Sequence, residues 1–215
     1  MKDLFKELKF IISPNGLRMR YYKLYNRLYF RFKGICFGEN MQVYNKIYIT
    51  GGGGNIHIGN NFHFTSGDGI NPICRNLRGC IHTESASSQI TIGDNVGMSS
   101  TCIWVRERLT IGNHVNIGAN VLIYDTDAHQ LDYLARRGER PANPDDVQTC
   151  VQSAPVTIEN DVWIGANCII LKGVTIGARS VIGAGSVVTK SLPADSIAAG
   201  NPCRVIRKME YMKNT

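Results

Sequence analysis

The sequence has no long apolar run and relatively few charged residues. Its apolar runs, such as Cys168–Leu171, span only a few positions, whereas a membrane-spanning helix needs about 20 apolar residues. The N-terminus mixes acids with bases and has no small-residue cleavage site after an apolar run, so we expect no secretory signal. With 43% hydrophobic and 19% charged residues over 215 positions, the composition is typical of a folded domain and excludes a disordered or fibrous chain.

The seven cysteines lack the spacing of a disulfide framework or a zinc site. Their number is odd, their positions are scattered and no Cys-x-x-Cys pair occurs. We therefore expect free thiols in a reducing cytoplasm, some of them packed as small apolar side chains. No metal is expected either, because no fourth ligand accompanies Asp125, Asp127 and His129 at a telling spacing.

The net positive charge of the chain lies in its N-terminal segment. The chain has 24 bases and 17 acids, a net charge of +7, and residues 1–34 hold nine of the bases and two of the acids. The remaining residues are therefore neutral overall. A neutral body gives no support for nucleic-acid binding, and no nucleic-acid partner is expected.

Residues 1–34 also hold eight of the 18 aromatic side chains and predict a basic, amphipathic helical arm. At about 100° per residue, one helical face collects an apolar row and a basic row lies beside it. The apolar row is Leu17, Tyr21, Leu24, Leu28 and Phe32, and the basic row is Arg20, Lys23, Arg27 and Arg31. A turn at 13–16 separates this helix from a shorter amphipathic piece at 2–12. The arm could lie on an anionic membrane surface, but we favour packing of the apolar row on its own domain or on another subunit.

A repeat of six residues dominates the rest of the chain. Aliphatic residues recur at this spacing at Ile158, Ile164, Ile170, Ile176, Ile182 and Val188. An earlier block is Ile111, Ile117 and Ile123, and the block before it is Ile92, Met98 and Trp104. Seven residues instead of six separate Trp104 from Ile111, so one residue is inserted there. A weaker first block is Ile58, Phe64 and Ile70. Period six fits neither a helix nor simple strand alternation. It predicts short strands that turn a corner every six residues and stack coil on coil around an aliphatic column.

Four segments of this repeat carry a resemblance to a known family: Val162–Asn167, Gly173–Gly177, Val181–Lys190 and Ala199–Pro202. They resemble the hexapeptide-repeat acyltransferases, nearest the maltose and galactoside O-acetyltransferases and the surface-polysaccharide O-acetyltransferases. The resemblance covers residues from about 90 to 207 and reaches weakly back to 58. It implies an all-β solenoid, a left-handed parallel β-helix with three hexapeptides per coil, a homotrimer with active sites between subunits, and acetyl-coenzyme A as co-substrate. The expected domains are the arm at 1–34, the β-helix at 35–207 and a tail at 208–215.

The repeat breaks between Ile123 and Ile158, and we expect an extruded loop at about 125–155. Long excursions from a regular solenoid are usually functional or disordered. This one carries His129, with Asp125, Asp127 and Asp132 around it. Acyl transfer from a thioester needs a base that works near neutral pH, and an imidazole oriented by a carboxylate suits that task.

His129 is the best candidate among five histidines, because the others sit in coils or in an irregular stretch: His57, His63, His82 and His114. Taken alone, a loop histidine could be a solvated bystander. The resemblance favours catalysis, since the family has its catalytic histidine in this loop, and it implies that Asp127 or Asp125 orients the ring. Direct transfer in the family argues against Cys150 as an acyl carrier.

The resemblance also assigns residues to the two substrates. Backbone amides at Gly165 and Ala166 match a thioester-facing turn that can hold an oxyanion. The full set expected to bind the cofactor is Gly165, Ala166, Ala184, Thr189, Lys190, Arg204 and Arg207. The two arginines could equally be a plain basic C-terminus. Glu107, Asp132 and Trp163 are the acceptor candidates, although Trp163 could instead cap the edge of a coil.

The sequence thus predicts a cytoplasmic O-acetyltransferase that transfers an acetyl group directly to a hydroxyl of a sugar or glycan precursor. Contact of residues 1–34 with the cytoplasmic face of a membrane would make it peripheral. One alternative is acetylation of an antibiotic or other small molecule. A second is a non-catalytic β-helix scaffold, and the presence of His129 in its loop argues against it.

Overall fold

The structure, a computed structural model, describes residues 14–67, 71–74 and 77–210. The amphipathic piece predicted at 2–12, the inward position predicted for Ile70 and residues 211–215 of the tail lie outside these ranges. No helix in the described part of the chain is long and apolar enough to cross a membrane.

Three sheets of parallel strands form the body, and the chain visits them in turn. The first sheet contains β1 (Cys36–Phe37), β4 (Asn55–Ile58), β7 (Gln89–Ile92), β10 (Arg108–Ile111), β13 (Val156–Ile158) and β16 (Thr175–Ile176). The second contains β2 (Gln42–Tyr44), β5 (His63–Thr65), β8 (Gly97–Ser99), β11 (Asn116–Ala119), β14 (Trp163–Ile164), β17 (Val181–Ile182) and β19 (Ser196–Gly200), with β20 (Cys203–Lys208) antiparallel at its edge. The third contains β3 (Tyr48–Gly51), β6 (Cys80–Thr83), β9 (Cys102–Val105), β12 (Leu122–Tyr124), β15 (Ile169–Ile170) and β18 (Val187–Val188).

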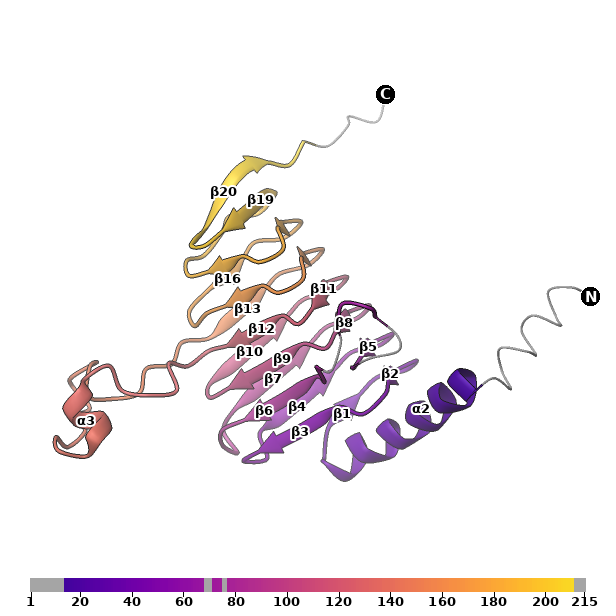
Figure 1. Cartoon of the computed structure of the whole chain (residues 1–215), viewed down its shortest axis with the longest axis horizontal. Helices are drawn as coiled ribbons and strands as arrows, with labels where there is room; N and C mark the ends of the chain where they lie inside the picture. Colours follow the sequence, from indigo (N-terminus) through magenta and orange to yellow (C-terminus); the bar gives the residue numbers. More distant parts are fainter. Residues whose placement is uncertain (1–13, 68–70, 75–76, 211–215) are drawn as a thin grey trace, which may run out of the picture.

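Each coil contributes one strand to each sheet and pairs with the coils on either side, so the coils stack along one axis (Figure 1). In the first sheet, for example, Ile92 pairs with Ile111 and Ile111 with Ile158. The parallel sheets agree with the stacked coils that the six-residue repeat predicts, and they fit the left-handed β-helix that the resemblance implies.

The core of the stack is a set of inward aliphatic columns. Ile158, Ile164 and Ile170 come from three successive strands of one coil, and each is 0% exposed. Burying a side chain of this size contributes about 1.5–3 kcal/mol. One predicted member was wrong: Trp104 faces outward and the buried residue is Ile103, which pairs with Ile123. The chain gains its extra length after this strand, in the turn that leads to β10.

Helix α2 (Pro14–Phe32) covers the N-terminal end of the stack (Figure 1). Asn26 is fully buried, and its amide nitrogen donates to the backbone oxygens of Val43 and Asn45 at 2.9 Å each. Phe30 is also fully buried. The apolar row does not pack on its own domain, because α2 packs through the opposite side and the row from Leu17 to Phe32 is exposed. The other half of the expectation, packing of the row on another subunit, stays a prediction.

The segment 125–155 connects β12 of the third sheet to β13 of the first, and Figure 1 shows it reaching away from the coils. It contains the short helix α3 (Tyr133–Arg137). An antiparallel bridge between Thr126 and Ser153 joins its two ends. The loop therefore starts and finishes at the same corner of the stack.

Candidate functional site

The corner between the third and first sheets carries most of the polar residues singled out above. Successive coils place residues 84–88, 106–107, 125–155, 171–174 and 189–191 at this corner. Because the coils stack, segments far apart in sequence become neighbours along one edge of the molecule. We refer to this edge as the loop corner.

Asp125 is fully buried at the loop corner and holds the turn of the preceding coil. Its carboxylate accepts hydrogen bonds from the backbone N–H groups of Arg106, Glu107 and Arg108, each at 2.7 Å. Three such bonds to one carboxylate order the longer turn between β9 and β10. Asp125 is thus used to position Glu107, and its carboxylate oxygens are already taken by backbone donors instead of an imidazole.

Asp127 pairs with a lysine of the next coil. Its Oδ1 lies 3.1 Å from Lys172 Nζ, and its backbone N–H donates to the oxygen of Gln152 at 2.9 Å. Both side chains are only partly exposed. No local pattern singles out Lys172, because it comes close to Asp127 only when the coils stack.

His129 is exposed at the end of a tight turn that follows Asp127. Its backbone N–H donates to the oxygen of Asp127 at 2.7 Å, and Ala128 between them adopts a φ of +62°. Thr126 closes the start of the turn by accepting from Ala128 N–H at 3.1 Å. No hydrogen bond to the imidazole is found among the described residues, so the turn presents the ring to solvent. Orientation of the ring by Asp127 stays a prediction.

Asp132 caps the N-terminus of helix α3. Its side chain accepts from the N–H groups of Ala135 at 2.9 Å and Leu134 at 2.7 Å, and it forms an ion pair with Arg140. The hydrogen bond from Ala135, followed by that from Leu134 and the charge of Arg140, lowers the pKa of Asp132. These contacts give the predicted acceptor residue a structural task.

An open cavity of about 560 Å³ lies beside the base of the loop. It is lined by Glu84, Ser85, Ser87, Arg106, Glu107 and Ser153. Ser153 from the far end of the loop donates to Glu107 Oε2 at 3.3 Å, and Arg106 lies 3.7 Å from Glu84. Carboxylates, hydroxyls and a guanidinium in one hollow suit a hydroxyl-rich ligand better than an apolar one.

The residues predicted to hold the thioester lie at another corner, between the second and third sheets. Gly165 and Ala166 follow β14 there, and Ala184 follows β17 on the next coil. The coils approach closely at this point, since a Cβ on Gly165 would lie 2.5 Å from the Ala184 nitrogen. Glycine is therefore required where the backbone must pass this close.

Trp163 lies on the outer surface of the second sheet and is 57% exposed. It borders an open groove of about 450 Å³ together with His63, Gly97 and Asn116. Asn116 pairs with Gly97 on one neighbouring strand and with Trp163 on the other. Gly97 has no side chain, so the surface is hollow at its position. Trp163 therefore borders the groove, as an acceptor-side residue could.

The other expected cofactor residues are spread along the stack. Thr189 and Lys190 are exposed and follow β18, at the loop corner. Arg204 and Arg207 lie on β20 at the C-terminal end, with exposed side chains that donate only to the backbone oxygens of Cys203 and Lys208. A single chain thus separates the His129 turn and the Gly165 turn onto two corners.

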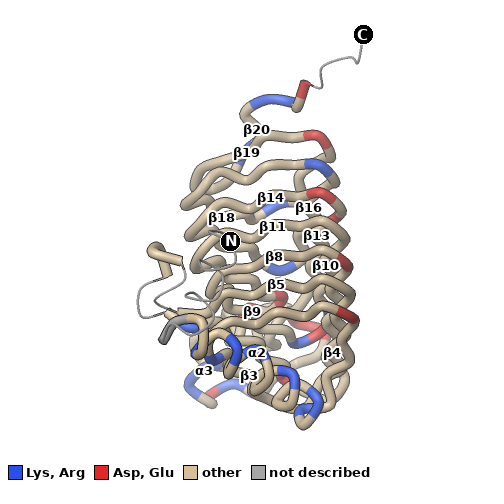
Figure 2. The backbone as a smooth tube through the Cα atoms, turned by 90° about the vertical axis from the view of Figure 1, so that its right-hand side faces the viewer, with Lys and Arg blue, Asp and Glu red and all other residues tan. Residues whose placement is uncertain are grey.

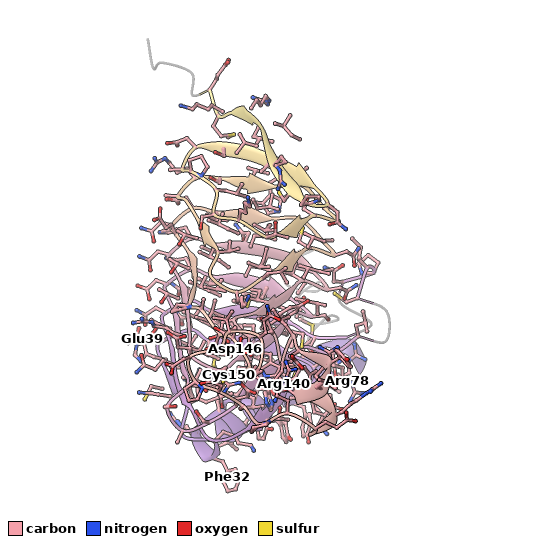
Figure 3. All side chains as sticks on the ribbon, turned by 90° about the vertical axis from the view of Figure 1, so that its left-hand side faces the viewer. Phe32, Glu39, Arg78, Arg140, Asp146 and Cys150 are labelled. Carbon is pink, nitrogen blue, oxygen red and sulfur yellow. The ribbon has the colours of Figure 1, made fainter. Side chains whose placement is uncertain are left out.

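No group of three or more His, Cys, Asp or Glu side chains placed to hold a metal ion occurs within the described ranges. All seven cysteines are free thiols, three of them buried. Cys150, in the loop, donates to the backbone oxygen of Asn143 at 3.0 Å. Figure 3 shows it near Asp146, on the side of the molecule from which the loop projects.

Comparison with known proteins agrees with the repeat. Residues 155–190 match the bacterial transferase hexapeptide family, with its six repeats. Over 172 residues the chain is 37% identical to a galactoside O-acetyltransferase of Escherichia coli K12, which covers 80% of this chain and 63% of the relative. Residues 155–190 thus carry the repeat of the hexapeptide transferases, and most of the chain is similar to the galactoside O-acetyltransferases. It spans about three fifths of the length of the galactoside O-acetyltransferases that it matches.

Two solved structures share the fold of this hexapeptide-repeat chain. A hexapeptide-repeat acetyltransferase from Vibrio cholerae has a TM-score of 0.54 and 26% identity, covering 95% of this chain and 86% of its own. An N-acyltransferase from Bacillus cereus, solved with dTDP-4-amino-4,6-dideoxyglucose and coenzyme A, has a TM-score of 0.64 and 23% identity, covering 86% and 90%. The second likeness speaks for the fold alone.

Proposed function

We propose that the protein is an acetyl-coenzyme A-dependent O-acetyltransferase that acts on a hydroxyl of a sugar or glycan precursor, with His129 as general base. The observation that carries the proposal is the exposed imidazole on a turn tied to the coil repeat by Asp125 and Asp127. The acetyltransferase names of the relatives support the reaction class. The polar cavity beside Glu107 and Ser153 supports a hydroxyl-rich acceptor.

The proposed reaction is direct transfer. His129 takes the proton of the acceptor hydroxyl as its oxygen forms a bond to the thioester carbonyl carbon. Backbone N–H groups of the Gly165–Ala166 turn hold the oxyanion that develops on the carbonyl oxygen. The carbon–sulfur bond then breaks, and the imidazolium returns its proton to the departing thiolate. The products are an acetyl ester and the free thiol of coenzyme A.

The two corners can cooperate only if a second chain completes the site. We propose a homotrimer of left-handed β-helices in which the loop of one chain faces the Gly165–Ala166 turn and the Trp163 groove of the next. The outer surface of the third sheet supports such an assembly, because Tyr48, Trp104 and Leu122 are exposed there. Light scattering should therefore return a particle of three 23.8 kDa chains.

In this arrangement Ala184, Thr189 and Lys190 would line the pantetheine arm, and the exposed Arg204 and Arg207 would meet the phosphates of the coenzyme. Arginine suits that task because its planar fork matches phosphate oxygens. Lys172 joins the site as a positioning residue, because it holds the Asp127 side chain directly before the His129 turn.

Replacement of the base tests the proposal. His129→Ala should lower kcat by about 10²–10⁴, the usual contribution of general-base catalysis, and leave coenzyme A affinity within a few fold. The assay follows release of the coenzyme A thiol with a panel of sugars, nucleotide sugars and antibiotics as acceptors. His114→Ala is the matched control. His114 lies at the corner between the first and second sheets, where its backbone N–H donates to the backbone oxygen of Asp94.

Two results would contradict the mechanism. Full activity of His129→Ala together with an inactive Cys150→Ala enzyme would indicate a covalent acyl-cysteine route. Absence of thiol release with every acceptor, in a chain that still forms trimers, would favour a non-catalytic scaffold.

A further inference from the structure

Helix α2 presents a continuous apolar row to solvent. Its members are 56–86% exposed: Leu17, Tyr21, Leu24, Leu28 and Phe32. Figure 3 shows Phe32 pointing away from the body at the N-terminal end of the stack. Five large apolar side chains in one row exceed the scattered exposure that is normal for a protein surface, and such a row usually marks an interaction site.

The row cannot turn toward the body, because the opposite side of α2 is anchored there. Asn26 lies half a helical turn away from the row and donates two hydrogen bonds to the first coil. On the same side, Phe30 is fully buried. The Tyr29 hydroxyl adds a 3.3 Å hydrogen bond to the Ile49 oxygen. The fold therefore holds the apolar row outward in a defined orientation.

Positive charge lines one flank of the row. The helix carries five bases and no acid, and Figure 2 shows basic segments gathered at this end of the stack. Arg20, Lys23, Arg27 and Arg31 share the flank beside the row, in the order that helical geometry requires. The guanidinium groups of Arg27 and Arg31 lie 5.9 and 5.8 Å from the centre of the Phe37 ring, which keeps these two charges beside the row.

Tyrosines line the other flank. The rings of Tyr21, Tyr25 and Tyr29 are stacked along the helix with centroid separations of 5.9 and 5.8 Å. Tyrosine combines an apolar ring with a hydroxyl, so it suits the boundary between hydrocarbon and water. An apolar centre, a basic flank and an aromatic flank together define the surface of an interfacial helix.

We propose that this face of α2 docks on an anionic lipid surface. Leu17, Leu24, Leu28 and Phe32 would enter the headgroup boundary while the bases meet lipid phosphates. A nucleic acid would leave the leucine row without a counterpart. A second copy of the same face would cover the apolar row but would bring no anionic group to the bases, because α2 carries no acid.

The experiment is sedimentation of the full chain with vesicles of phosphatidylcholine alone and of phosphatidylcholine with 30% phosphatidylglycerol. Wild-type protein should bind the anionic vesicles, with an affinity that falls as salt rises, and should bind the neutral vesicles much more weakly. Leu24→Glu with Leu28→Glu should abolish binding. Arg20→Ala with Lys23→Ala should weaken it roughly 25-fold, about fivefold for each base removed.

Matched variants away from α2 serve as controls. Val205→Ser with Ile206→Ser removes exposed apolar side chains from β20, and Arg108→Ala with Lys208→Ala removes two exposed bases. Both should bind vesicles like the wild type. A Phe32→Trp variant adds a direct readout, since bromine-labelled lipid should quench the new indole and leave the emission of Trp104 and Trp163 unchanged.

Three outcomes would overturn the proposal. The first is no binding to anionic vesicles at low salt. The second is unchanged binding by the Leu24→Glu, Leu28→Glu protein when its melting temperature shows that it is folded. The third is a change in oligomeric state of that variant together with absence of Phe32→Trp quenching, which would make the apolar row a contact between protein chains.

Discussion

The coils from β13 to β18 and the loop at 125–155 use sequence in opposite ways. In the coils one contact recurs every six residues, so Ile158, Ile164 and Ile170 are all buried by the same geometry. In the loop every polar contact occurs once: Asp125 holds the turn at 106–108, and Asp127 pairs with Lys172. The coils therefore supply a repeated core, while the loop depends on single interactions with particular residues.

In the loop, the residues that stabilise the structure differ from the residue proposed for catalysis. The acids around His129 all have structural partners, since Asp125 binds backbone N–H groups, Asp127 pairs with Lys172 and Asp132 caps α3. The imidazole is left as the exposed group of the turn. The carboxylates thus order the segments around the His129 turn, and the proposed reaction needs an accessible imidazole.

The largest expected effect tests the repeat itself. Ile170→Ala should lower the free energy of unfolding by about 2–5 kcal/mol, because it opens a cavity in the aliphatic column. Ile169→Ala on the same strand should cost much less, since Ile169 faces outward and is only half-buried. Urea denaturation of the two variants measures the difference. If Ile169→Ala lost as much stability as Ile170→Ala, and lost more at lower protein concentration, then another chain would cover Ile169.

The sequence predicted the coils well because each register position is repeated, so a local pattern reports long-range pairing. It failed at Trp104, where Ile103 and Trp104 are both apolar and strict spacing selects the wrong one. The buried carboxylate of Asp125 supports a longer turn there, and nothing in the local spacing indicates that contact. On α2 the apolar row was found correctly, but one buried polar residue, Asn26, decides which side packs. Lys172 was missed because its partnership with Asp127 exists only between coils.

Replacement of Asp125 tests whether the loop and the 106–108 turn of the preceding coil both depend on this carboxylate. Asp125→Asn should lower the free energy of unfolding by about 1–3 kcal/mol, because an amide can accept through only one of its two terminal atoms and leaves a backbone donor unpaired. It should also raise the acceptor KM, since the turn that carries Glu107 loosens. Denaturation and acceptor titration measure the two effects. A loss of kcat alone would instead indicate that Asp125 acts on His129.

A smaller effect is expected for the Asp127–Lys172 pair. Asp127→Asn and Lys172→Met should each lower kcat by about tenfold or less, because a partly exposed ion pair contributes about 1 kcal/mol or less. The double variant should be no worse than either single one if the pair acts as a unit. Additive losses would show that Asp127 and Lys172 act separately, with Asp127 orienting the ring by itself.

The smallest effect on global stability is expected from Asp132, and its sign depends on pH. Folding lowers the pKa of Asp132, chiefly through the hydrogen bond from Ala135. Its contribution is therefore complete above the unfolded value, at about pH 4, and is lost as the pH falls through the lower folded value. Limited proteolysis should find the loop protected at neutral pH and cleaved only in acid, whereas Asp132→Ala, which removes the capping oxygen, should be cleaved at both, with a nearly unchanged melting temperature. Because α3 has only five residues, its order depends strongly on this cap. Identical acid sensitivity in the variant would assign the transition to another carboxylate of the loop.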